Sequence, residues 1–211
     1  MRRYTAGRNG WPMEDYGSGF EAEPGLDEGS IVARAQDGDL RAFEHLVNSY
    51  QGRLFRLAYR MLNDRGDAED VVQEALTASW RGLARLQDVQ AFGGWVYRLA
   101  TNRCLDVLRK RSTRTEHITD PQDILSISTD GAGSDQLSDP AYAAERTARD
   151  DGLTAVLNTL PPEQRACWLL REMHGRSYAE IGATLKISPT AVRGRLARAR
   201  IQIAEGMNEW R

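Results

Sequence analysis

The sequence has little cysteine or histidine. Its 211 residues include two cysteines, Cys104 and Cys167, which lie far apart and form no CxxC motif, and three histidines that do not cluster with them. This composition disfavours a zinc site, and we predict no bound metal. The two cysteines are interpreted as small buried apolar residues of a protein in a reducing compartment.

Long apolar runs are also missing. No segment approaches the roughly 18 apolar residues that a membrane-spanning helix needs. The first residues include Arg2 and Arg3 but no apolar core of the kind found in secretory signals. We therefore expect a cytoplasmic protein with no direct membrane insertion.

Features of an enzyme are not found in the sequence. It shows no nucleophile–base constellation, no phosphate-binding loop and no cluster of metal ligands, and the three histidines lie in unrelated segments. We therefore predict a protein that is not an enzyme, with no cofactor and no small-molecule substrate.

An excess of one charge is missing overall, because 28 basic residues face 30 acidic ones. The charges are nevertheless segregated. Residues 31–111 carry thirteen basic and ten acidic side chains, residues 112–151 three and nine, and residues 152–211 nine and five. Two mildly basic blocks separated by an acidic segment exclude the class of uniformly basic proteins that coat nucleic acid. They predict two small domains joined by a linker.

Apolar residues recur at helical spacing, and no alternation typical of strands is found, so the predicted fold is all-α. A tail rich in Gly, Pro, Asp and Glu is predicted to be disordered. The predicted division of the chain is a tail at 1–29, a helical domain at 30–111, a flexible acidic linker at 112–140 and a second helical domain at 141–211.

Within the first domain, the apolar pattern and the breaks predict four helices. A short helix at 30–36 is followed by a turn whose last residue, Asp39, is an N-cap. The long second helix is expected to end at a break from Asn63 to Gly66. The third helix would run from about 67 to 83 with Trp80 facing inward, and the fourth, after a loop at 87–94, from about 95 to 111.

One face of the third predicted helix carries acids and amides. Asp70, Gln73, Glu74 and Thr77 fall at positions i, i+3, i+4 and i+7, so they share the side opposite the apolar residues. Such a face is a poor ligand for DNA and a good partner for a basic protein surface. A helix face that simply contacts solvent would show the same pattern.

Residues 177–200, SYAEIGATLKISPTAVRGRLARAR, have the pattern of a helix-turn-helix. Ser177 with Glu180 predicts a capping box, and Ser188 before a proline predicts the start of the last helix. The turn would lie around Lys186. Pro161-Pro162 predicts the start of an earlier helix. The residues expected to hold the helix-turn-helix together are Ile181, Leu185, Ile187, Val192 and Leu196.

The outward face of the last helix has small residues near its beginning. Thr190, Gly194 and Ala197 would permit close approach to the major groove. Arg193 and Arg198 flank this strip and could reach bases or phosphates. The alternative is a three-helix bundle whose arginine-rich face only contacts solvent.

The two blocks, in this order, resemble the sigma-70 family of bacterial RNA polymerase specificity subunits. Residues 67–76, DAEDVVQEAL, are similar to the family's polymerase-binding signature. Leu160-Pro161 and the helix-turn-helix resemble its C-terminal domain, and the short two-domain form matches the extracytoplasmic-function (ECF) subgroup. The residues that resemble the family's promoter-opening helix are Phe92, Trp95, Tyr97, Arg98, Asn102, Asp106, Leu108 and Arg109.

The resemblance implies three binding surfaces. Core RNA polymerase, through the clamp helices of its largest subunit, would contact Asp67, Asp70, Gln73, Glu74 and Thr77. The −10 promoter element would be recognised and melted by Leu86, Phe92, Arg98, Asn102, Arg103, Arg109 and Lys110. The −35 element would be contacted by Arg171, Ser188, Thr190, Arg193, Gly194, Ala197 and Arg198.

The resemblance also implies partners. The second domain would contact the flap of the polymerase's second largest subunit, and an anti-sigma factor would hold the protein inactive. Two positions depart from the family pattern: Leu86 stands where an aromatic residue is common, and Lys186 where helix-turn-helix turns usually have glycine. The competing interpretation is a stand-alone helix-turn-helix regulator, which would bind duplex DNA tightly without polymerase.

Overall fold

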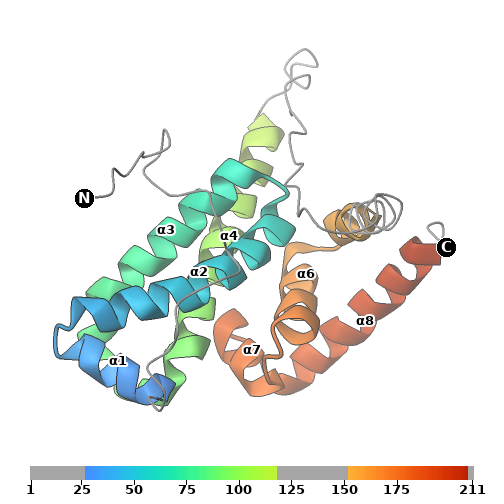
Figure 1. The fold of residues 1–211 in the computed structure, drawn as a ribbon. Coiled ribbons are helices and arrows are strands. Elements are labelled where there is room, and N and C mark those ends of the chain that lie inside the picture. The colour runs from blue at the N-terminus through green and yellow to red at the C-terminus, as the bar shows by residue number, and fades with distance from the viewer. Residues whose placement is uncertain (1–26, 118–151, 209–211) are drawn as a thin grey trace, which may run out of the picture.

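The computed structural model describes residues 27–117 and 152–208, and throughout these two ranges the regular structure is helical, without strands (Figure 1). The all-α prediction is confirmed for this part of the chain. The first half contains α1 (Glu28–Gln36), α2 (Leu40–Leu62), α3 (Arg65–Gly82), the 3-10 turns η1 (Leu83–Arg85) and η2 (Val89–Ala91), and α4 (Phe92–His117). The second half contains a helical stretch at 152–159, then α6 (Pro162–Trp168), the π-helical η3 (Leu169–Met173), α7 (Tyr178–Leu185) and α8 (Pro189–Met207).

The first helix begins earlier than predicted, at Glu28 rather than Ser30. The side chain of Asp27 accepts a hydrogen bond from the Ser30 amide at 3.0 Å and so caps α1. Residues 1–26 of the predicted tail lie outside the described residues. The predicted N-cap Asp39 is confirmed, since its carboxylate accepts from the Arg41 amide at 3.0 Å.

The break between α2 and α3 is shorter than predicted. Asn63 ends α2 in the left-handed conformation with φ 50°, as a C-terminal residue of a helix commonly does. Asp64 then caps α3 by accepting from the Asp67 amide at 2.8 Å. Because this cap starts the helix at Arg65, Gly66 lies inside α3, and the prediction that it belongs to the break was wrong.

The fourth helix extends beyond both predicted ends. The carboxylate of Asp88 accepts from the Gln90 amide at 2.9 Å and caps the start of η2, so the predicted loop at 87–94 is largely helical. α4 then starts at Phe92 and continues to His117, six residues into the predicted linker. The remainder of that linker, from 118 to 140, lies outside the described residues.

The core of the first half forms between α2, α3 and α4, which contact one another (Figure 1). The prediction that Trp80 faces inward was wrong: the side chain is 38% exposed and lies against Phe43 with ring centroids 4.7 Å apart. Cys104 and Cys167 are free and buried, as predicted. Burial raises the pKa of the Cys104 thiol to about 12, so it stays neutral.

The helix-turn-helix forms with the predicted caps. Ser177 and Glu180 make the capping box, and Ser188 caps α8 by accepting from the Ala191 amide at 3.1 Å. Lys186 takes the left-handed conformation, with φ 56°. A residue without a side chain is needed at Gly182 inside α7, where an added Cβ would come within 2.7 Å of the Ile187 carbonyl oxygen. The buried residues between the two helices include Ile181, Val192 and Leu196.

The two halves are in contact: α4 contacts α6 and α7, and α2 contacts α6 and η3. Arg165 on α6 is buried and joins them through its guanidinium. Its Nη1 donates to the Met61 carbonyl oxygen at 2.6 Å and to Asn158 Oδ1 at 2.9 Å, and its Nη2 donates to the Asn158 carbonyl at 2.9 Å. None of the helices described is both long enough and apolar enough to cross a membrane.

Candidate protein and nucleic-acid interfaces

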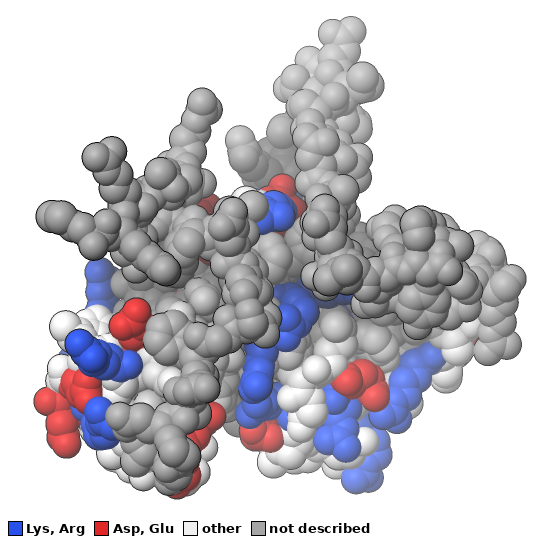
Figure 2. All heavy atoms as spheres, in the orientation of Figure 1, with Lys and Arg blue, Asp and Glu red and all other residues white. Residues whose placement is uncertain are grey.

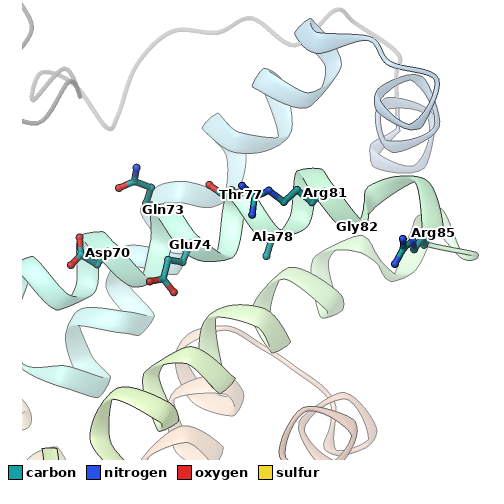
Figure 3. A pocket seen from close by; sticks show the side chains of 8 residues that line it. All are labelled: Asp70, Gln73, Glu74, Thr77, Ala78, Arg81, Gly82 and Arg85. Carbon is teal, nitrogen blue, oxygen red and sulfur yellow. The ribbon is translucent and has the colours of Figure 1, made fainter. Parts of the chain in front are cut away.

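The acidic and amide side chains of α3 come together in an open groove of about 840 Å³ (Figure 3). Figure 3 shows Asp70 and Glu74 toward one end and Arg81 and Arg85 toward the other. Four of the five residues predicted to bind polymerase line this groove and are exposed: Asp70, Gln73, Glu74 and Thr77. The surface therefore offers negative charge and hydrogen-bonding groups to a protein partner.

Asp67, the fifth residue of that set, is placed differently. It is half-buried in the first turn of α3 and does not line the groove. Its carboxylate accepts a hydrogen bond from Arg111 of α4, whose guanidinium also donates to the Leu62 carbonyl at 2.8 Å. Asp67 thus connects the start of α3 to α4.

The residues predicted to bind the −10 element differ in exposure and lie on different faces of the structure. Arg98, Arg109 and Lys110 are exposed on α4 and Asn102 is half-buried. Arg98, Asn102 and Arg109 share one face of the helix by their spacing. Arg103 lies elsewhere, because its Nη2 donates to Glu74 Oε1 at 2.7 Å.

Phe92 was assigned to the DNA-binding set, and the structure contradicts this. The side chain is 1% exposed and packs edge-on against Tyr50, with ring centroids 5.5 Å apart. Phe92 is a core residue because α4 begins three residues earlier than the pattern indicated. Leu86 is half-buried against the same core, and its carbonyl accepts from Gln36 Nε2 at 2.7 Å.

Most of the predicted −35 set lies on the exposed side of α8. Thr190, Arg193, Ala197 and Arg198 are exposed, and Gly194 is half-buried. Figure 2 shows blue Lys and Arg side chains at the lower right, where α8 lies in Figure 1. This face combines small residues with guanidinium groups, as major-groove contact requires.

Three further residues of this region have internal partners. The hydroxyl of Ser188 is used in the cap of α8. Arg171 is half-buried, donates to the Arg176 carbonyl at 3.0 Å and lies over the Tyr178 ring at 5.1 Å. Arg200 donates to Glu172 Oε1 at 2.6 Å. Arg171 and Arg200 therefore hold η3 and the loop before α7 against the helix-turn-helix.

A cluster at the junction of the two halves had no signal in the sequence. The Tyr97 hydroxyl and His174 Nδ1 are hydrogen-bonded at 3.0 Å, and the Arg176 guanidinium lies 4.5 Å from the centre of the Tyr97 ring. Tyr97 is buried, and this raises its pKa. These residues come from segments about 80 positions apart, so no local spacing could have indicated their contact.

Comparison with known proteins agrees with this geometry. A family model described as Sigma-70 region 2 matches residues 46–114, and one described as Sigma-70, region 4 matches residues 151–203. The chain is 34% identical over 174 residues to the ECF RNA polymerase sigma factor SigE of Mycolicibacterium smegmatis, covering 82% of this chain and 64% of that one. It is 32% identical over 178 residues to the RNA polymerase sigma-H factor of Pseudomonas aeruginosa, covering 84% and 92%.

Two solved structures share the fold. CnrH, in complex with the cytosolic domain of CnrY, aligns with a TM-score of 0.62 at 24% identity, covering 86% of this chain and 97% of that one. The sigma factor RpoE of Bartonella quintana, in complex with the anti-sigma factor NepR, aligns with a TM-score of 0.63 at 20% identity, covering 80% and 98%.

The two family models together match more than half of the residues, in the order expected for a two-domain sigma factor. The chain therefore belongs to the sigma-70 family of RNA polymerase sigma factors. Relatives that are named as ECF sigma factors, at 31–34% identity, place it in the ECF subgroup.

Proposed function

We propose that this protein is a non-catalytic specificity subunit of bacterial RNA polymerase that directs transcription from particular promoters. The observation that carries the proposal is the presence of two opposite surfaces in one chain. α3 exposes carboxylates and amides in a groove, and α8 exposes arginines beside small residues. The first surface suits a basic protein and the second suits DNA. The proposal places the protein in the cytoplasm with the polymerase.

The α3 groove is proposed to bind the clamp helices of the polymerase's largest subunit. The side chains of Asp70, Gln73 and Thr77 are exposed and form no ion pair or hydrogen bond with other described residues, so they are available to a partner. Exposed carboxylates of this kind contribute mainly to the rate and specificity of association. The second half is proposed to contact the flap of the second largest subunit.

The amino-terminal half is proposed to recognise and open the −10 element. Opening requires a base to leave the stack and to be held by polar groups and a flat or apolar surface. Asn102 can offer an amide to a base edge, while Arg98, Arg109 and Lys110 can contact backbone phosphates. The stacking surface must be supplied by residues other than Phe92, which is buried.

The carboxy-terminal half is proposed to read the −35 element with α8 in the major groove. Thr190, Gly194 and Ala197 permit close approach, while Arg193 and Arg198 supply donors for guanine or phosphate. Arg193 lies over the Tyr178 ring at 5.9 Å, which orients it on the surface of the helix-turn-helix.

We further propose an amino-terminal domain that ends with α4 at His117 and a carboxy-terminal domain that includes residues 152–208. An anti-sigma factor is proposed to control the protein. Both solved structures of the same fold contain a second protein, which is an anti-sigma factor in the case of RpoE.

The test is runoff transcription with bacterial core polymerase on a fragmented genomic library. Wild type is compared with Asp70→Ala/Gln73→Ala and with the control Glu44→Ala/Asn48→Ala, whose two residues are exposed on α2 outside the groove. We expect discrete transcripts that are lost in the first variant and kept in the control. Tight duplex binding by the protein alone, with no transcript that depends on it, would instead establish a stand-alone regulator.

A further inference from the structure

A second pocket lies where the two halves of the molecule meet, and none of the proposed polymerase or promoter contacts lines it. It has a volume of about 210 Å³. The first half contributes two residues of α2 and one of α4, and the second half contributes the end of η3 and the loop after it. The lining residues are Arg53, Arg56, Tyr97, Met173, His174 and Arg176.

This junction pocket carries a concentration of positive charge. Arg53 and Arg56 are exposed, and in the described ranges neither forms an ion pair with a carboxylate. Arg176 approaches from the second half and is paired with Glu180 at 3.1 Å. Of the three guanidinium groups that line the pocket, only that of Arg176 is paired with a carboxylate, and the mutual repulsion of the three positive charges opposes contact between the halves. Figure 2 shows blue side chains along this junction.

His174 adds an unused polar atom to the pocket. Its Nδ1 is bonded to the Tyr97 hydroxyl, and its Nε2 is buried without a hydrogen-bond partner. Burial and, to a smaller extent, the charges of Arg56, Arg176 and Arg53 together lower the pKa of His174 to about 4. The imidazole is therefore neutral at pH 7, and an anion among these arginines would reverse the electrostatic part of that effect.

We propose that the junction pocket binds a small phosphate-type dianion, either inorganic phosphate or the phosphate of a monoester. Guanidinium groups match phosphate oxygens in geometry and charge. The volume is below the roughly 300 Å³ at which pockets for drug-sized ligands begin, so a compact anion fits and a folded peptide segment does not. Arg53 and Arg56 come from one half and Arg176 from the other, so the bound anion holds the halves together.

The binding test needs no polymerase, so its failure is distinguishable from failure of the proposed function. Calorimetric titration of the full chain uses inorganic phosphate at constant ionic strength maintained with chloride. Wild type is compared with Arg56→Gln and with Arg41→Gln, an exposed arginine of the same helix outside the pocket. We expect saturable binding of one phosphate, weakened about tenfold or more in Arg56→Gln because a charge-assisted bond is lost, and unchanged in Arg41→Gln.

A second measurement locates the anion. The protein has three histidines, so the imidazole resonances can be assigned one at a time by NMR. We expect phosphate to raise the pKa of His174 and to leave the chemical shifts of the His45 imidazole unchanged. A methyl phosphate titration separates the two sources, since tighter binding than inorganic phosphate identifies a monoester. Equal binding by Arg56→Gln and wild type, or an unshifted His174, overturns the proposed site.

The bridging role is tested by small-angle X-ray scattering with and without phosphate. We expect the radius of gyration of wild type to decrease on binding and that of Arg56→Gln to stay constant. Binding without any change in scattering would leave the site standing and overturn the bridge. An Arg56→Gln defect seen only with a duplex DNA probe, and not with phosphate, would identify a nucleic-acid contact and overturn the proposal.

Discussion

Arg103 on α4 donates from Nη2 to Glu74 Oε1 on α3 at 2.7 Å. This pair joins the proposed polymerase-binding face to the helix proposed to open promoter DNA. Both side chains are partly exposed, at 35% for Arg103 and 51% for Glu74. An ion pair this exposed contributes about 1 kcal/mol or less to stability, so its importance lies in the position of the two groups.

Replacement of Arg103 or of Glu74 should therefore have a similarly small effect on stability, and only replacement of Glu74 should weaken binding to core polymerase. We expect Arg103→Gln to change the free energy of unfolding by less than about 1 kcal/mol. Glu74→Gln should be similarly mild for stability and should weaken binding to core polymerase, because Glu74 lines the groove. Urea denaturation and fluorescence anisotropy with core polymerase measure the two effects. Arg109→Gln is the control, since Arg109 pairs with Asp106 of the same helix and does not line the groove. An equal loss of polymerase binding in Arg109→Gln would contradict the assignment.

Lys186 should be replaceable by glycine with a gain in stability. Its φ of 56° is costly for a residue with a side chain, and glycine takes this conformation freely. Relief of the left-handed conformation outweighs the greater entropy of glycine in the unfolded chain, so we expect Lys186→Gly to raise the free energy of unfolding by about 0.5–1 kcal/mol, as measured by chemical denaturation. Lys186→Ala removes the same charge and keeps the unfavourable φ, so it should give no gain. Equal stabilisation by both changes would show that charge, and not backbone conformation, is responsible.

Arg165 should be hard to replace. The buried guanidinium donates to the Met61 and Asn158 carbonyls, and its loss would leave these acceptors without partners at the contact between the halves. We expect Arg165→Gln to lower the free energy of unfolding by about 2–4 kcal/mol. Arg165→Lys should be intermediate, because lysine keeps the positive charge but cannot make the several hydrogen bonds of the planar guanidinium. Thermal unfolding measures the order. A variant as stable as wild type would mean that the contact contributes little.

His174 should make stability depend on pH. Its folded-state pKa of about 4 lies below the ordinary value of 6.5, so the folded state binds protons less readily than the unfolded chain. The stabilisation is complete above pH 6.5 and is lost as pH falls from about 6.5 toward 4. After allowance for solvent screening, the loss is on the order of 2 kcal/mol. His174→Gln should flatten the curve in this window, measured by denaturation at successive pH values. Identical curves for the variant and wild type would refute the prediction.

Local rules accounted for much of the fold. Asp39, Ser177 with Glu180, and Ser188 were all predicted as caps and all are observed, because a cap depends on residues within one turn. Spacing likewise predicted that Asp70, Gln73, Glu74 and Thr77 share one face of α3, and these four residues line the groove. The start of α1 was misplaced because the predicted tail was taken to run to residue 29, whereas the Asp27 side chain caps the helix and starts it at Glu28.

Contacts between distant segments could not be predicted in this way. Phe92 was expected in a loop that meets DNA, and it is buried because the Asp88 cap begins helical structure earlier. Arg103 was assigned to DNA without any indication of Glu74, which lies 29 residues away in the sequence. The pairing of Tyr97 with His174 depends on how two halves pack, which periodicity within one helix does not report.

Arg198 and Arg200 lie close together on α8 and differ in whether their side chains have a partner within the protein. Arg198 is exposed and has no hydrogen bond or ion pair recorded in the described part of the chain, whereas Arg200 is bound to Glu172. If α8 enters the major groove, Arg198→Ala should weaken duplex binding and reduce the slope of log affinity against log salt by about 1 for a lost phosphate contact. Arg200→Ala removes the same charge and should leave that slope nearly unchanged. Anisotropy with a −35 duplex over a range of salt concentrations measures both slopes. Equal slopes for the two variants would show that the arginines act only through net charge, so α8 would lack the proposed orientation in the groove.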